Sequence, residues 1–434
     1  MLSMAERMTG RKKTPSAPAI GTLPFRAIVL AIAGLLLTIL LAPRRVSGAE
    51  FMIQPAFSLS EEYNDNIFLT TTNRQQDYIT SAIPAVKLFY KTDLWAWDVD
   101  YAYIYRYYAE GKVTDDSTQT AHVTNKTELI KNTFFIALKD DYSRVSLDLA
   151  RDYTQESLSV NQTDENIFTV NPYIIVRNES RSPIELGYIY LSTWYKDPSA
   201  IGYLEQTEYA KMTTELSSHT TFTTGARYSR NMNNVDTFDK FDIYAGPQYT
   251  YAPDSYIYLI VGNSLLDFDT TGHTSQAFWN AGLTHQYSTI TVSLYTGLSY
   301  IPDPTYVVRR VDSYIASLKK TTTRMTLQFS CGMTEYRDAA KKYLEEDTYQ
   351  VEGSAKYSFS PRSAVTVDVS VEQLRDYLND YKQNVYLNRL RFEHQATGKL
   401  TLALEYRYQN AYSPDVYTYN YYNNRIIGEM KMAF

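Results

Sequence analysis

Residues 95–108 read WAWDVDYAYIYRYY, and this stretch decides the fold of the 434-residue chain. Every second position is aromatic or apolar: Trp95, Trp97, Val99, Tyr101, Tyr103, Tyr105 and Tyr107. Asp98, Asp100 and Arg106 fall between them. A period of two places the two sets on opposite faces of a β-strand, and over about ten residues it is typical of a strand that crosses a membrane in a β-barrel. We therefore expect the polar face to line a barrel interior.

The same alternation recurs in residues 324–333, 363–374 and 399–410. The polar positions of these strands and of the first give the candidate lumen-facing residues: Asp98, Asp100, Arg106, Asp368, Glu372, Glu405 and Arg407. Mixed charge of this kind predicts a wet lumen whose balance tunes which solutes pass. The alternative is that the charges pair with one another and fill the interior. No dense Arg/Lys ladder is visible in the sequence, which favours a neutral or weakly selected solute over a polyanion.

Short turn signals separate neighbouring strands: KTDL at 91, IKNT at 130, RNESRS at 177, SSHT at 217, APDS at 252, YST at 287, KKTTT at 319, SFSPRS at 358 and ATGK at 396. Longer polar segments such as SRNMNNVDTFDK and LDFDTTGHTSQ lie between them, as in barrels with short turns at one end and long loops at the other. With an opening strand near residues 51–60 and a closing strand at the C-terminus, we expect an all-β, antiparallel, up-and-down transmembrane barrel of about 20 strands, within 18 to 22. A soluble all-β protein is the alternative for each strand taken alone.

Three prolines fall inside apparent strands, at Pro84, Pro172 and Pro247. Proline removes a ladder hydrogen bond and belongs at strand starts, edges or bulges. Their similar placement before a short turn predicts a repeated hairpin design with local bulges.

Residues 1–49 have the features of a cleavable signal peptide. Basic residues precede an apolar run from Ala27 to Ala42, and the small residues Ser47, Gly48 and Ala49 follow it. The run is shorter than the roughly 20 residues of a membrane-spanning helix, so we expect export and cleavage at Ala49. An uncleaved anchor is the alternative. The predicted division is therefore a signal peptide over 1–49 and a barrel over 50–434, with no plug before the first strand.

Composition supports a membrane surface and argues against nucleic acid. The chain has 41 Tyr, a residue whose apolar body and polar tip suit a boundary between water and lipid. Residues 1–49 hold seven Lys/Arg and one acid, which leaves 35 basic and 47 acidic residues in the remainder. An acidic body of this kind gives no electrostatic reason to bind nucleic acid. Cys331 is the single cysteine, and we expect it to face lipid.

The sequence does not predict an enzyme, a cofactor or a metal site. Glu61, Glu62 and the polar residues 64–66 offer oxygen ligands for Ca²⁺, but their spacing lacks a calcium-loop pattern, and an exit turn is the simpler interpretation. The histidines are scattered without metal-ligand spacing. His285, near Thr284 and Ser288, carries the less favoured alternative of an outer-membrane hydrolase.

The chain ends NYYNNRIIGEMKMAF, residues 420–434. Met430, Met432 and Phe434 alternate with polar residues on what we expect to be the lipid-facing side of the closing strand. This ending resembles the aromatic C-terminal signal that the assembly machinery of outer-membrane barrels reads.

Residues 57–70, FSLSEEYNDNIFLT, together with the strand patterns and Phe434, resemble the β-barrel porin 2 family and related barrels of exopolysaccharide systems. The resemblance implies a barrel in the outer membrane of a Gram-negative bacterium. It implies a porin-like channel that passes solute or polysaccharide, with membrane lipid, the barrel-assembly machinery and polysaccharide export components as partners. A non-conducting structural or interaction barrel of a surface polysaccharide assembly is the alternative. The resemblance carries no catalytic residues.

Overall fold

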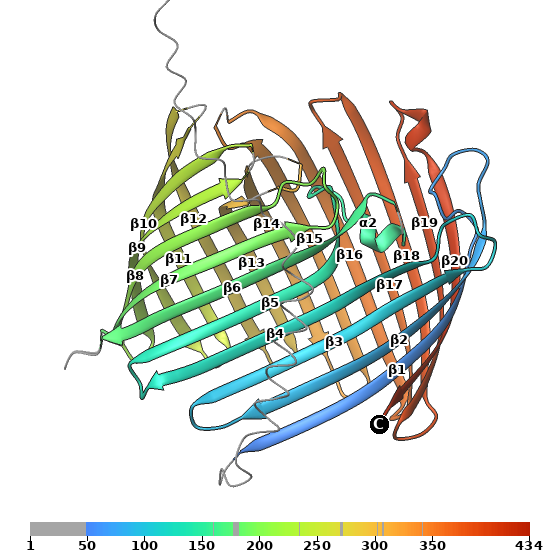
Figure 1. The fold of residues 1–434 in the computed structure, drawn as a ribbon, viewed down its shortest axis with the longest axis horizontal. Helices are drawn as coiled ribbons and strands as arrows, with labels where there is room; N and C mark the ends of the chain where they lie inside the picture. The colour runs from blue at the N-terminus through green and yellow to red at the C-terminus, as the bar shows by residue number, and fades with distance from the viewer. Residues whose placement is uncertain are drawn as a thin grey trace, which may run out of the picture. The chain divides into compact units, whose positions relative to one another are not determined.

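Twenty antiparallel strands among the described residues form one continuous sheet that closes on itself (Figure 1). The computed structural model describes residues 49–158, 160–176, 182–233, 235–269, 272–301, 303–305, 308–340 and 342–434. Each strand pairs with the next along the chain, and β1 also pairs with β20, from Ala56 opposite Ala433 to Asn64 opposite Arg425. Closure leaves no free sheet edge at the seam, as lipid requires. The predicted fold and strand number are confirmed.

The strands are β1 (Glu50–Asn64), β2 (Asp77–Lys91), β3 (Trp95–Tyr108), β4 (Asp116–Ile130), β5 (Phe134–Ser146), β6 (Gln162–Val176), β7 (Ile184–Tyr195), β8 (Tyr203–Ser217), β9 (Thr220–Asn233), β10 (Thr237–Ala252), β11 (Ser255–Phe268), β12 (Gly272–Tyr287), β13 (Ile290–Ile301), β14 (Arg309–Thr321), β15 (Met325–Asp338), β16 (Leu344–Ser360), β17 (Ser363–Asp376), β18 (Tyr381–Gln395), β19 (Leu400–Tyr412) and β20 (Tyr421–Ala433). The described helices are α2 (Tyr153–Glu156) and the 3-10 turn η1 (Tyr417–Tyr419). Neither has the length and apolar character of a membrane-crossing helix. Of the predicted signal peptide, only Ala49 lies within the described residues.

Eight of the nine predicted short turns join consecutive strands at one end of the barrel. The ninth, RNESRS at 177, lies outside the described residues except for Ser182, between β6 and β7. Asn132, Asp254 and Ser288 take positive φ of 59°, 54° and 51° in three of them, a conformation that Asn and Asp tolerate better than most residues. The long-loop prediction is wrong for two connections at the other end. The joins β9–β10 and β11–β12 span only 234–236 and 269–271, because most of the polar residues assigned to loops extend the strands.

The side-chain alternation follows the sequence pattern. In β17, Val367, Val369 and Val371 are exposed on the outer face. The intervening Asp368 and Glu372 line a cavity inside the barrel. An apolar outer face and a polar inner face are what a lipid-exposed barrel around a wet lumen requires.

The three strand prolines interrupt the sheet without shifting it. In β2 the pairs with β3 stop at Ala82 and resume at Ala85, in the same register, on either side of Pro84. The ladders from β6 to β7 and from β10 to β11 have the same gap at Pro172 and Pro247. The predicted bulges are therefore wrong at these positions. Each proline faces the following strand with the side of its backbone that has no N–H to donate, so the ladder is interrupted there while the register continues unchanged.

The wall separates at two places in the half opposite the short turns. Strands β12 and β13 pair only from Asn280 opposite Gly297 down to their turn. Residues 272–279 of β12 pair with β11 alone, and residues 298–301 of β13 pair with β14 alone. Similarly, β4 and β5 pair only up to Ala121 opposite Tyr142. Where the pairing of β4 with β5 and of β12 with β13 ends, the β5–β6 and β13–β14 hairpins turn inward. There they contact side chains on the inner faces of other strands.

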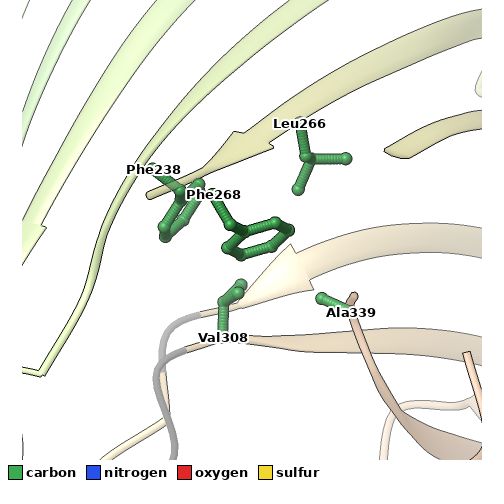
Figure 2. Close-up of a cluster of buried hydrophobic side chains, with 5 residues drawn as sticks. All are labelled: Phe238, Leu266, Phe268, Val308 and Ala339. Carbon is green, nitrogen blue, oxygen red and sulfur yellow. The ribbon is translucent and has the colours of Figure 1, made fainter. Parts of the chain in front are cut away.

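An apolar cluster lies where the β13–β14 hairpin turns inward. Phe238 of β10 and Leu266 and Phe268 of β11 pack against Val308, which precedes β14, and Ala339, which follows β15. Figure 2 shows the two groups of side chains facing one another across the space between the strands. Their burial stabilises the inward position of the β13–β14 hairpin.

Candidate functional site in the barrel lumen

The connection between β5 and β6, residues 147–161, crosses the interior. Its helix α2 starts after Asp152, whose carboxylate accepts a hydrogen bond from the Thr154 amide at 3.0 Å. Aspartate is a favoured N-cap because it satisfies an amide left free at a helix start. Strands β5 and β6 are separated from β18, β19 and β20 by several strands of the wall (Figure 1). Side chains of this segment nevertheless bond to all three of those strands.

Five buried residues hold the crossing segment in place, and we call them the latch: Arg151, Glu156, Gln383, Gln409 and Tyr421. Arg151 Nε donates to Glu156 Oε1 at 2.7 Å. Arg151 Nη2 donates to the Tyr421 hydroxyl at 2.6 Å, and Gln409 Nε2 donates to Glu156 Oε2 at 2.6 Å. Gln383 accepts from Arg151 Nη1. A buried ion pair is tolerated when its remaining groups are bonded in this way, and removing one partner is strongly destabilising.

The charge state of Arg151 is fixed by its surroundings. Burial lowers the pKa of Arg151, but the adjacent Glu156 carboxylate outweighs burial and holds the pKa well above its ordinary value. Arg151 therefore stays charged within the latch.

Apolar contacts seal the flanks of the crossing segment. Val160 packs against a cluster that includes Leu69 and Val385. Leu158 packs against another that includes Ile67 and Ile79. The Tyr336 hydroxyl of β15 donates to the Leu149 carbonyl at 3.0 Å. The segment thus contacts the first strands, β15 and the last three strands.

The inward β13–β14 hairpin closes another part of the interior. Arg309, at the start of β14, forms ion pairs with Asp303 at 3.3 Å, Glu345 at 3.2 Å and Glu346 at 2.5 Å. The Pro304 carbonyl accepts a hydrogen bond from the Ile201 amide at 2.7 Å, which ties this loop to the β7–β8 loop. Two loops from separate parts of the wall therefore restrict the same end of the lumen.

A cavity of about 410 Å³ lies against α2 on the inner faces of β15 to β20. This volume is within the range of small-molecule sites, roughly 300–1,000 Å³. The lining is polar, with Asp152 and Glu156 from the crossing segment and amide, hydroxyl, carboxylate and guanidinium groups from the wall. Such a surface suits a hydrophilic solute.

Three of the seven predicted lumen residues, Asp368, Glu372 and Arg407, line this cavity. The other four, Asp98, Asp100, Arg106 and Glu405, lie on the same face of the wall. Glu405 pairs with Arg391 at 3.0 Å and also with Arg407. In β3, Asp100 pairs with Lys87 at 2.8 Å, Arg106 pairs with Asp116 at 3.3 Å, and Asp98 is two residues from Asp100. Their part in solute selection stays a prediction.

The sequence interpretation missed a row of arginines. Arg389, Arg407 and Arg425 lie directly opposite one another on β18, β19 and β20. The expectation that no basic ladder exists is wrong for this part of the wall. The alternation of Arg389 and Arg391 with Leu390 and Phe392 was the available signal for β18, but register between strands is needed to see the row.

The oxygen-rich segment after Phe57 acts in barrel closure. Glu62 pairs with Arg425 Nε at 2.7 Å, and Asp65 accepts from the Asn424 side chain at 2.7 Å. Asn66 Nδ2 donates to the Tyr422 carbonyl at 3.0 Å. Among the described residues, no group of three or more His, Cys, Asp or Glu is placed to hold a metal ion.

The C-terminal residues lie as predicted on the outer face of β20, and Phe434 is exposed. The Phe434 amide donates to the Pro55 carbonyl at 3.0 Å, which holds the terminus against β1. Whether Met430, Met432 and Phe434 form an assembly signal stays a prediction. Cys331 lies opposite Ala316 and Val351 on the outer face. His285 stacks on Tyr251 and contacts its hydroxyl at 3.1 Å.

Comparison with solved structures supports the fold. The chain is similar to the FrpB iron transporter from Neisseria meningitidis (F5-1 variant), with a TM-score of 0.52 and 8% identity over 88% of this chain and 82% of that chain. The apoprotein form of the same transporter gives 0.50 and 8% over 88% and 81%. The siderophore receptor PirA from Pseudomonas aeruginosa gives 0.47 and 9% over 90% and 81%. No protein-family model matches the chain, and no curated protein does. At 8% identity, the likeness to the two FrpB structures shows a shared β-barrel fold.

Proposed function

We propose that the protein is an outer-membrane channel for a hydrophilic solute, and that the latched segment 147–161 closes it. The observation that carries the proposal is the latch itself. A polar cavity lies against the segment, whose buried side chains bond to β18, β19 and β20. A barrel of about 20 strands is wide enough to enclose an aqueous lumen, so movement of this segment opens a path.

The exopolysaccharide association rests on the resemblance of residues 57–70 to the porin 2 family. We propose on that basis that the solute belongs to a surface polysaccharide system, with export components as partners and the outer membrane of a Gram-negative bacterium as location. Membrane lipid and the barrel-assembly machinery are the further partners that such a location entails.

Single-channel recording in planar bilayers tests the proposal. We expect the full chain to be closed most of the time, and Arg151→Gln combined with Glu156→Gln to raise the open fraction by about tenfold or more, because the ion pair and its hydrogen bonds are lost. Changing both residues avoids leaving one buried charge unpaired.

Arg375→Gln is the matched control, since this arginine lies outside the cavity and is partly exposed beside Asp347. We expect it to record like the wild type. If the wild type and the latch variant are both folded barrels and neither passes current, the channel is excluded.

The second candidate function is a non-conducting barrel that supports a polysaccharide assembly. The apolar seals on both flanks of the crossing segment favour it. This function predicts a partner that co-purifies with the protein, together with a latch variant that still passes no current.

A further inference from the structure

Five aromatic side chains on the inner wall between β8 and β13 each lie over a glycine. Directly opposed residues share a face of the sheet, and the pairs that run from Asp368 of β17 to Gln286 of β12 mark the inner face. Every second residue of β12, counted from Gln286, therefore faces the lumen, and pairing extends this face to β8 and β13. We call the five inner rings the aromatic patch: Tyr209, Tyr244, Tyr258, Phe278 and Tyr295.

Each ring occupies the space above its glycine. A Cβ on Gly187 would lie 2.5 Å from Tyr209 Cζ, and a Cβ on Gly225 would lie 2.5 Å from Tyr244 Cζ. Because glycine leaves this space free, one side of each ring rests on the wall and the rest stays open to the lumen. All five rings are partly exposed, and Tyr295 is 37% exposed. The other three pairs are Phe278 over Gly262, Tyr258 over Gly282 and Tyr295 over Gly297.

The rings recur at a regular interval across the strands. Gly262 of β11 lies directly between Tyr244 of β10 and Phe278 of β12. Neighbouring strands lie roughly 4.8 Å apart, so the two aromatic residues are roughly 10 Å apart across the wall. This interval is comparable to the length of a disaccharide unit, so the patch suits an extended chain with repeated flat faces. The same order recurs on β11, β12 and β13 as Tyr258, Gly282 and Tyr295.

Polar side chains hold two of the rings in place. The Tyr209 hydroxyl donates to Glu185 Oε1 at 2.9 Å, and the Tyr258 hydroxyl donates to Asn280 Oδ1 at 2.9 Å. Gln248 lies opposite Tyr258 on the same face and is exposed. Its amide both donates and accepts hydrogen bonds. The wall beside the rings therefore offers partners for hydroxyl groups.

Two ion pairs border the patch at Tyr209. Lys211, two residues along β8, pairs with Glu185 at 3.3 Å, and the lysine side chain is the more exposed, 40% against 26%. Arg227, opposite Tyr209 on β9, pairs with Asp242 at 2.6 Å and is 45% exposed against 1% for the aspartate. Ring faces attract cations, but the exposed ends of these pairs repel a cationic ligand. Each is also neutralised by its own acid, so the patch as a whole favours an uncharged ligand.

We infer that the aromatic patch binds a saccharide chain of uncharged sugar units. The C–H faces of the sugars stack on the rings, and their hydroxyl groups bond to the polar side chains beside them. This inference rests on the proposed function only in treating the lumen as open to solute, and it agrees with the neutral solute that the sequence favoured. An aromatic ring over a glycine also stabilises a sheet, so the test measures binding by folded barrels.

Equilibrium binding to the full chain tests the inference without any need for current. Isothermal titration calorimetry, in micelles of a detergent without a sugar head group, compares cellohexaose with glucose. We expect cellohexaose to bind at least about tenfold more tightly, because several rings contact it at once. Tyr244→Leu and Tyr295→Leu should each weaken its binding by about three- to tenfold, whereas Tyr244→Phe keeps the ring and should stay within about twofold of the wild type.

Tyr249→Leu is the matched control. This tyrosine is in the same strand as Tyr244, but it lies on the outer face and is 48% exposed. We expect wild-type affinity for cellohexaose, with circular dichroism showing that every variant is a folded barrel.

Two results overturn the inference: equal affinity for glucose and cellohexaose, or wild-type affinity for cellohexaose in folded Tyr244→Leu and Tyr295→Leu. Binding of cellohexaose without current rejects the channel alone, and current without binding of cellohexaose rejects the saccharide patch alone.

Discussion

Gly246 in β10 lies where the backbones of β10 and β11 approach closely. A Cβ at this position would lie 1.8 Å from the Leu259 carbonyl oxygen of β11, beside the ladder gap at Pro247. We expect Gly246→Ala to reduce the free energy of unfolding by about 1–3 kcal/mol, since backbone has to move to relieve the overlap. Urea unfolding in lipid vesicles measures it. Gly353→Ala is the control, because nothing lies within 4 Å of a Cβ there; equal midpoints for the two variants would contradict the close approach.

Asp148, in the crossing segment, gives the barrel a pH dependence. Burial raises the pKa of Asp148 above its ordinary value of 3.8, against the hydrogen bond from the Ala150 amide and the charges of Arg309 and Arg151, while Asp303 raises it further. Between the ordinary and the raised pKa, the folded state therefore binds more protons than the unfolded state. The contribution of the Asp148 carboxyl to folding stability falls as the pH rises through that window. Glu346 and Glu372 also face this carboxylate.

We expect Asp148→Asn to stabilise the fold at neutral pH and to lose that advantage as the pH falls toward 3.8. Unfolding free energies of the wild type and the variant, measured across that range, check this expectation. A variant that is less stable than the wild type at neutral pH would mean that attraction to Arg309 and Arg151 outweighs burial.

At the residue scale, the sequence could reveal only what alternation encodes. Asp368 and Arg407 were predicted to face inward because each occupies the polar phase of a period-two strand, and both line the cavity. Arg151 and Glu156 carry no such signal, because they belong to a connection without periodicity. The arginine row depends on register between β18, β19 and β20, which is set by pairing in space.

At the element scale, the separation of β12 from β13 predicts uneven hydrogen exchange within one strand. Residues 272–279 pair with β11 only, whereas 280–284 pair on both sides. Amides of 272–279 directed toward β13 have no ladder bond, so we expect peptides from this half to exchange faster than peptides covering 280–284. Strand β17 is the internal control, since it pairs along its length with β16 and β18. Uniform protection along β12 would show that the wall is closed there.

The sequence did not predict these separations for a physical reason. Alternation continues through β12 and β13 regardless of whether their backbones pair. What draws the strands apart is packing of the β13–β14 hairpin against the inner faces of β10 and β11 (Figure 2), a contact between segments distant in sequence. Turn signals, by contrast, are local, and the eight that fall on described residues placed a connection correctly.

At the scale of the whole molecule, strand number and closure followed from simple requirements. Lipid leaves no unpaired edge, so a chain of outward-apolar strands joined by tight turns has to close, and its last strand has to meet its first. The pairing of β1 with β20 satisfies this requirement. These requirements do not predict which segments occupy the lumen, because two barrels with the same wall can differ in which loop turns inward.

Closure in the observed register is testable by disulfide formation between the two ends of the chain. Ser58 lies opposite Lys431, and Ala433 lies one step along the same inner face, opposite Ala56. Directly opposed residues have Cα atoms roughly 4.5–5.5 Å apart, and diagonal neighbours roughly 7–8 Å. Disulfides require a Cα separation below about 7 Å. With Cys331→Ser as background, Ser58→Cys with Lys431→Cys should oxidise efficiently, and Ser58→Cys with Ala433→Cys should not, as read by mass spectrometry of the linked peptides. Linkage of the second pair instead of the first would mean a register shifted by two residues. Such a shift would separate Glu62 from Arg425, and the terminal salt bridge behind the arginine row depends on that pair.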